Sequence, residues 1–230
     1  MKIHIFYSHY EVTGTDYKYR PNWFDYEKCF VNLLNTIEGK NNVSLHVMMD
    51  GKIENNWIKK YKDKYIGHEF IGGSMERAAM EIYKTCYEYS NNMEDTDLFY
   101  FLENDYLHVD GWVDKVTDLF STYSGLHYVS LYDHGDKYFH PNYDDLVSKL
   151  FVSNTHHWRT MMSTCGSFVV SKKLWKEDYD FHTSIVGDHN KWLAIAEQRE
   201  RFLLSAVPGL STHCMEGLLS PTIDWKKINN

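Results

Sequence analysis

The sequence predicts a single-domain α/β protein with a mostly parallel sheet flanked by helices. The first reason is that short apolar segments alternate with amphipathic helical stretches along almost the whole chain, as in strands joined by crossover helices. The second is that neither an internal repeat nor a Pro-, Gly- or Ser-rich linker divides the 230 residues. One domain over residues 1–230 is therefore expected, and ligands of such sheets bind at the carboxyl ends of the strands.

The expected strands are short runs rich in aromatic and β-branched residues, bounded by turn residues. They cover residues 2–10, 43–51, 67–73, 97–105 and 127–135, with a further strand opening 165–175 and a last short strand or loop in 203–214. In the first of them, alternation places Ile3, Ile5 and Tyr7 on one face and His4 and Phe6 on the other.

The expected helices have apolar residues at helical spacing. They cover residues 23–39, 55–65, 74–90, 111–123 and 188–205. Gly39 ends the first, and Ser74 is the expected N-cap of the third. The stretch 136–159 is polar, aromatic and irregular, and no regular element is expected there.

Composition excludes several classes of protein. The formal net charge is −8, and no long basic run is present, so a nucleic-acid partner is not expected. No segment reaches the roughly 18 apolar residues of a membrane span. The four cysteines are scattered without a C-x-x-C pair, which is typical of reduced core thiols in a cytoplasmic protein.

The most informative segment is DLFYFLEND, residues 97–105, an apolar run that ends in Glu103-Asn104-Asp105. Two carboxylates at the end of a central strand suit Mg²⁺ or Mn²⁺, which bind through one or two carboxylates plus substrate phosphates. An acidic turn without any ligand is the alternative, because a bare E-x-D matches often by chance.

Three further sites each allow two interpretations. The turn Gly72-Gly73-Ser74 opens a helix and could bind an anion, with Arg77 nearby or merely solvated. Asp188 precedes a helix as a cap or as a general base. His213 is a structural histidine or a third metal ligand.

These elements, in this order, resemble a nucleotide-sugar glycosyltransferase of the GT-A fold, similar to family 2, over nearly the whole chain. Glu103-Asn104-Asp105 replaces the family's D-x-D motif, and Gly166-Ser167-Phe168 looks like its acceptor-side element. The size of the chain and its Asn-, Lys- and Tyr-rich composition suggest a divergent member of this family. The expected location is the cytoplasm, which is the host cytoplasm if the protein is viral.

The resemblance implies a nucleotide-sugar half at about 1–110 and an acceptor half at about 111–230. It implies that the donor, a UDP-sugar, is bound by residues at the first strand ends and the glycine turn: Ser8, His9, Tyr10, Asp50, Gly72, Gly73, Arg77 and Asn104. It also implies Mn²⁺ or Mg²⁺ held by Glu103, Asp105 and His213.

The implied reaction is inverting transfer of a hexose or deoxyhexose to a hydroxyl of a glycan or other acceptor. Asp188 would take the proton of that hydroxyl, and the metal would balance the charge of the departing diphosphate. Aromatic side chains suit sugar rings, and those expected at the acceptor come from the irregular region: Tyr138, His140, Tyr143, His156, His157 and Trp158.

Two other functions remain open. A sugar-nucleotide nucleotidyltransferase also uses an acidic metal site on such a sheet, but a Gly-rich, basic loop is expected after its first strand. In this chain that segment holds only Gly14 and late basic residues. A non-catalytic sugar-binding module would be favoured if Asp188 and His213 lay more than ~12 Å from any centre shared with the acidic pair.

Overall fold

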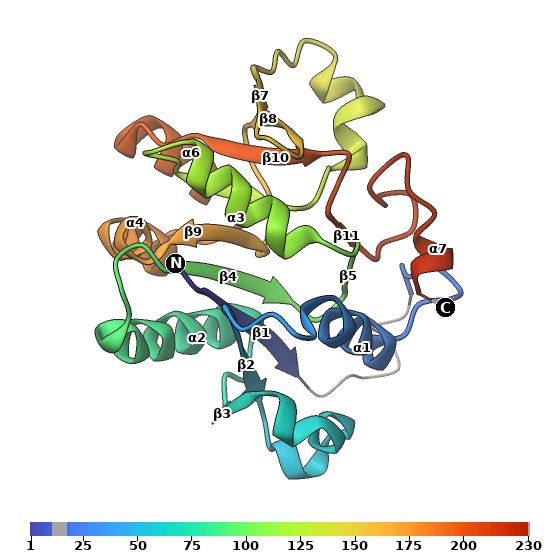
Figure 1. The fold of residues 1–230 in the computed structure, drawn as a ribbon, viewed down its shortest axis with the longest axis vertical. Helices are drawn as coiled ribbons and strands as arrows, with labels where there is room; N and C mark the ends of the chain where they lie inside the picture. Colours follow the sequence, from blue (N-terminus) through green and yellow to red (C-terminus); the bar gives the residue numbers. More distant parts are fainter. Residues whose placement is uncertain (11–17, 230) are drawn as a thin grey trace.

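The computed structural model describes residues 1–10 and 18–229, the side chain of Asn142 excepted. Within this part, a nine-stranded sheet runs in the order β3-β2-β1-β4-β9-β6-β10-β8-β7 (Figure 1). The strands are β1 (Ile3–Tyr10), β2 (Val43–Asp50), β3 (Ile66–Phe70), β4 (Leu98–Glu103), β6 (Tyr128–Ser130), β7 (Leu150–Val152), β8 (His157–Met161), β9 (Phe168–Ser171) and β10 (Leu203–Val207). A separate two-stranded sheet pairs β5 (Tyr106–His108) with β11 (Ser211–His213).

The expectation of a mostly parallel sheet is confirmed. Strands β3, β2, β1 and β4 are joined by parallel pairings, and β6 is parallel to β10. Only β8 and β9 run against the other strands of the nine, since each pairs antiparallel with both of its neighbours. The carboxyl ends of β1, β2 and β4 therefore meet at one edge, where the acidic pair lies.

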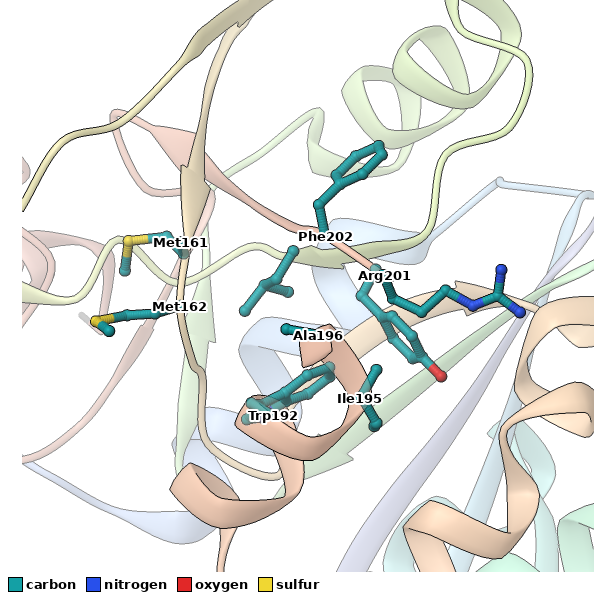
Figure 2. A pocket seen from close by; sticks show the side chains of 9 residues that line it. Met161, Met162, Trp192, Ile195, Ala196, Arg201 and Phe202 are labelled. Carbon is teal, nitrogen blue, oxygen red and sulfur yellow. The ribbon is translucent and has the colours of Figure 1, made fainter. Parts of the chain in front are cut away.

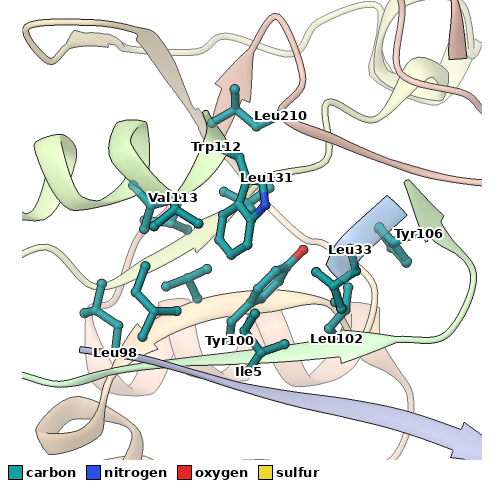
Figure 3. Close-up of a cluster of buried hydrophobic side chains, with 14 of the residues drawn as sticks. Ile5, Leu33, Leu98, Tyr100, Leu102, Tyr106, Trp112, Val113, Leu131 and Leu210 are labelled. Carbon is teal, nitrogen blue, oxygen red and sulfur yellow. The ribbon is translucent and has the colours of Figure 1, made fainter. Parts of the chain in front are cut away.

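Helices cover both faces of the sheet. They are α1 (Tyr26–Ile37), α2 (Met75–Tyr89), α3 (Trp112–Thr122), α4 (Lys172–Glu177), α5 (Tyr179–Ser184), α6 (Asp188–Arg199) and the terminal α7 (Trp225–Ile228). Helices α1 and α3 pack on the face that carries Ile5 and Tyr100, whereas α2, α4 and α6 pack on the face that carries Phe6 and Phe101. Figure 3 shows the first of these two cores around Tyr100 and Trp112.

The alternation expected in the first strand is thus confirmed, because neighbouring residues of β1 enter opposite cores. The expected N-cap is confirmed as well, since the Ser74 side chain accepts a hydrogen bond from the backbone N–H of Arg77. No helix of the described residues combines the length and the apolar character needed to cross a bilayer.

Three expectations about elements are wrong. Residues 55–65 form 3₁₀ turns instead of an α-helix, Ile53–Asn55 and Trp57–Lys64, the second distorted at Tyr61. The helix expected over 188–205 ends at Arg199, because Glu200 adopts a left-handed conformation (φ 54°) and the chain turns back into β10. The region 136–159 holds β7 and the start of β8, which extend the sheet by antiparallel pairing.

Buried histidines predict acid unfolding. Burial lowers the pKa of His9 to about 4 and that of four others, His46, His108, His134 and His182, to about 3. In the unfolded chain each takes up a proton near pH 6.5. The unfolded state therefore binds more protons below this pH, and stability is lost as the pH falls from about 6.5 towards the folded-state pKa values.

At pH 5 each of these histidines is expected to cost up to about 2 kcal/mol, from 1.36 kcal/mol per pH unit. Their sum is comparable with the whole stability of a domain, about 5–15 kcal/mol. The urea midpoint should therefore drop steeply between pH 6.5 and 5. A midpoint that stays constant over that interval would show that these imidazoles are solvated in the folded protein.

Candidate functional site

The site forms where the carboxyl ends of the parallel strands meet. The register pairs Ser8 with Glu103 and Tyr10 with Asp50, so the expected residues of β1, β2 and β4 share one edge. A tight turn after β4 leads into β5, whose antiparallel pairing sets Tyr106 opposite His213. This small sheet brings His213 to Asp105 from a distant part of the sequence.

Asp105 is held by two basic side chains. Its Oδ2 accepts hydrogen bonds from Nη2 of Arg20 at 2.6 Å and from Nε2 of His213 at 3.0 Å. The His213 ring also stacks on Tyr106, with 5.1 Å between centroids and 1° between planes. Oδ1 of Asp105 is buried and has no hydrogen-bond partner among the described residues.

Asp105 and its two basic partners stabilise each other's charged forms. Burial by itself raises the pKa of Asp105, but His213 and then Arg20 outweigh it, so the pKa of this carboxyl lies below its usual range. Burial alone would lower the pKa of His213, and the Asp105 carboxylate raises it to about 11. At neutral pH the site therefore holds an imidazolium and a guanidinium against one carboxylate.

Glu103 has a different environment. Burial raises its pKa to about 7, and the charge of Asp105 acts in the same direction. Oε2 of Glu103 accepts a hydrogen bond from Oγ of Ser167 at 3.1 Å. Gly166 leaves room for this carboxyl group, because a Cβ there would lie 3.1 Å from Cδ of Glu103. The Gly166-Ser167 pair thus positions the acid of the neighbouring strand.

Asp188 is the first residue of α6 and lies within electrostatic reach of the acidic pair. Its charge contributes to raising the pKa of Glu103 and of Cys165. The side chain is 44% exposed, and its Oδ1 pairs with Nζ of Lys191 at 3.1 Å. The cap interpretation is wrong, since Gly187 is the N-cap and no side chain caps this helix.

The fit of a divalent cation rests on the two carboxyl groups. No group of three His, Cys, Asp or Glu side chains is arranged as a ligand set within 1–10 and 18–229, and His213 binds Asp105 instead of facing a shared centre. The Oδ1 of Asp105, unpartnered among the described residues, and the half-buried Glu103 carboxyl, whose pKa the charge of Asp105 raises, nevertheless fit a hard cation, which prefers carboxylate oxygen.

The residues expected at the donor fall into two groups. Oδ1 of Asp50 accepts the N–H of Gly72 at 2.9 Å, which fixes the turn before α2. A side chain at Gly72 would collide with the backbone of Ala78 at 2.8 Å, so glycine is required there. Gly73 on this turn and Arg77 in the first turn of α2 are exposed, and Tyr10 is 37% exposed.

His9 and Asn104, by contrast, are almost fully buried and bond to each other. The Asn104 amide lies 3.3 Å from Nδ1 of His9, and Nε2 of His9 lies 3.0 Å from Oδ1 of Asn56. Asn56 in turn caps the Trp57–Lys64 turn through the N–H of Ile58. These contacts tie the ends of β1 and β4 to the loop after β2.

The residues expected at the acceptor do not form one surface. Tyr138 is exposed, donates to Oδ2 of Asp133 at 2.8 Å and carries the Arg159 guanidinium 4.5 Å above its ring. His140 and His157 are exposed and Tyr143 is partly so, whereas His156 is buried and bonds to the Pro208 carbonyl at 2.9 Å.

Trp158 requires a correction. Its side chain is fully buried in the core, and its indole N–H donates to Oγ of Ser153 at 3.2 Å. A tryptophan at an inward position of β8 has no surface for a sugar ring, so its expected place at the acceptor is wrong.

Sequence reasoning missed Arg20. No local motif marks it, since it lies in a polar loop far from Asp105 in sequence, and only the tertiary fold brings the two together. Cys165, expected as a core thiol, packs against the core and is partly buried, and its thiol also contacts His213. Burial raises the pKa of this thiol. A buried acid needs a basic partner, and this requirement makes Arg20 one candidate. The sequence alone does not show which basic residue contacts Asp105.

The two best-defined cavities lie away from this site. One of about 20 Å³ is enclosed between α6, β8 and β10, around Trp192 and Met161 (Figure 2). The other, about 680 Å³, opens at the amino-terminal ends of the strands near Leu98 and Leu126. Neither is lined by Glu103 or Asp105.

Comparison with known proteins bears on the fold. No protein-family model matches the chain, and no curated protein matches its sequence. A CMP:2-keto-3-deoxy-manno-octonic acid synthetase, solved with CTP, is similar with a TM-score of 0.54 at 9% identity, covering 91% of this chain and 92% of its own.

Two other solved structures are similar at lower scores. For the S. aureus TarS 1–349 fragment the TM-score is 0.47 at 11% identity, with 78% of this chain covered. This chain spans only 49% of that fragment. For the galactosyltransferase LgtC, solved with donor and acceptor sugar analogs, the TM-score is 0.45 at 10% identity, with 83% and 69% covered. The likeness to the synthetase, over nearly the full length of both chains, together with the observed sheet, shows the expected α/β fold, a mostly parallel sheet flanked by helices.

Proposed function

We propose that the protein is a metal-dependent glycosyltransferase that moves a sugar from a nucleotide diphosphate donor, a UDP-sugar, to a hydroxyl of a glycan or similar acceptor. The observation that supports this most is the unpartnered, buried Oδ1 of Asp105 beside Glu103, at the carboxyl edge of the sheet. Ligands of open α/β sheets bind at this edge. A carboxylate oxygen left without a partner in a buried position is costly unless a ligand binds it.

Each side chain then has a definite task. Asp105 and Glu103 would hold Mn²⁺ or Mg²⁺, which supplies Lewis-acid stabilisation of the departing diphosphate. Ser167 and Gly166 orient the Glu103 carboxyl group. Gly73 and Arg77, at the start of α2, would offer a backbone N–H and a cation to the donor, whereas Gly72 gives its own N–H to Asp50 and shapes the turn.

Asp188 is the proposed base of an inverting transfer. Its half-exposed carboxylate at the start of α6 can reach an acceptor in solvent, and its charge is felt at Glu103. It would accept the proton of the acceptor hydroxyl as that oxygen forms the new bond to the sugar. Tyr138 and His157 are exposed aromatic residues available to the acceptor.

The second candidate is a nucleotidyltransferase, favoured by the likeness to the synthetase. The loop that would hold a nucleoside triphosphate follows β1, and Gly14 in that loop lies outside the described residues. The two reactions differ in their products, because nucleotidyl transfer consumes a nucleoside triphosphate and releases pyrophosphate. Glycosyl transfer releases a nucleoside diphosphate.

A thermal-shift screen of nucleotide sugars and nucleoside triphosphates, each with Mn²⁺ or with EDTA, tests the proposal. A ligand at 100 times its Kd adds about 2.7 kcal/mol. For a chain of this size this corresponds to a rise in Tm of roughly 5–10 °C. A UDP-sugar should raise the Tm with Mn²⁺ and much less with EDTA. No shift with any nucleotide sugar would contradict the proposal, and a shift with CTP or UTP alone would favour the second candidate.

A further inference from the structure

Arg20 is held against Asp105 by several contacts. Its Nη2 donates to Oδ2 of Asp105 at 2.6 Å, and its Nη1 donates to the Cys214 carbonyl at 3.1 Å. The guanidinium also lies 5.1 Å from the centroid of the Phe24 ring. With a side chain only 13% exposed, Arg20 is a built part of the site and not a solvated surface arginine.

The same carboxylate is the proposed ligand of the divalent cation. Its Oδ2 already has two donors, Arg20 and His213, whereas Oδ1 has none in the described part of the chain. A cation that coordinates this group would lie close to the guanidinium, and like charges at short range in a buried place repel strongly. Arg20 and a divalent cation therefore cannot both occupy Asp105 without a large loss of affinity.

We infer that Arg20 is the resident counter-ion of Asp105, that a divalent cation displaces it, and that the released guanidinium then contacts the diphosphate of the donor. This inference rests on the proposed metal-dependent function. A planar guanidinium suits this second position, because it pairs bidentately with phosphate oxygens. Free metal should therefore bind weakly, and metal and nucleotide should strengthen each other's binding.

The test is Mn²⁺ titration followed by the EPR signal of the free ion, with and without UDP. Arg20→Gln should bind Mn²⁺ more tightly than the wild type when no nucleotide is present, by about 10-fold, within the usual range of coupling between sites. UDP should strengthen Mn²⁺ binding in the wild type and much less in this variant. Arg199→Gln, which removes an arginine paired with Asp180 away from the site, is the matched control and should behave as the wild type.

His213 still pairs with Asp105 in Arg20→Gln, so the variant should fold, and circular dichroism checks this. If Arg20→Gln does not fold, Arg20→Lys is titrated in its place. Lysine is a point charge without the bidentate fork, so the changes in Mn²⁺ affinity and in its strengthening by UDP are expected to have the same direction and a smaller size. Equal Mn²⁺ affinity of the variant and the wild type overturns the inference while leaving the cation site in place. Unchanged strengthening by UDP in the variant overturns the contact with the diphosphate. No Mn²⁺ binding to either protein overturns both the cation site and the inference.

Discussion

Asp105→Asn is expected to lose Mn²⁺-dependent hydrolysis or transfer of the sugar nucleotide almost completely. Removing one group that stabilises developing charge typically costs about 10²–10³-fold in rate. Asparagine keeps the shape of the side chain but removes the charge that the cation needs. The measurement is release of nucleoside diphosphate from a UDP-sugar at saturating Mn²⁺.

The same variant should also be less stable. It leaves Arg20 as a buried cation without its carboxylate and removes the charge that keeps His213 protonated. Breaking a buried ion pair typically costs about 3–5 kcal/mol. Asp178→Asn is the matched control, because Asp178 is a buried acid paired with Arg201 away from the site. It should lose stability in urea but keep activity. If Asp105→Asn keeps its Mn²⁺-dependent activity, the assignment of the metal is wrong.

Asp188→Asn is expected to separate binding from transfer. The nucleotide and Mn²⁺ should bind as in the wild type, because the carboxylate faces the acceptor in the proposed mechanism. Transfer should fall by about 10²–10⁴-fold, the usual contribution of a general base. Isothermal titration with UDP and a single-turnover transfer assay give the two quantities.

Asp180→Asn serves as the control for this second variant, since Asp180 is an exposed acid on α5 that pairs with Arg199. It should bind and transfer normally. Transfer by Asp188→Asn at a near wild-type rate would reduce Asp188 to the partner of Lys191, the only ion pair recorded for its carboxylate among the described residues.

The fold was predictable wherever local pattern and burial agree. In β1 and β4 neighbouring side chains enter opposite cores, so both faces are buried and the strands are visible in the sequence as short, mostly apolar runs. The pattern fails at 55–65, where Ile58 is the only buried apolar residue and little packing stabilises an α-helix. It fails again at β7 and β8, because an edge hairpin with exposed Leu150 and His157 lacks a clear apolar face.

The candidate site was predictable in part. Glu103 and Asp105 follow a strand whose hydrophobicity marks it as central, and the order of elements placed His213 near them. What could not be predicted is the bond between His213 and Asp105, since it depends on the pairing of β5 with β11. Arg20 and the buried state of Trp158 are likewise tertiary facts, set by packing between segments distant in sequence.

The most direct measurement is a crystal structure with UDP and Mn²⁺, with anomalous data collected above the manganese absorption edge. The proposed function predicts one anomalous peak between the diphosphate and the carboxylates of Asp105 and Glu103. The inference on Arg20 adds that this side chain turns from Asp105 to a phosphate oxygen. Arg20 still paired to Asp105 beside the metal would contradict that inference alone, and bound UDP with no anomalous peak at these carboxylates would contradict the proposed function.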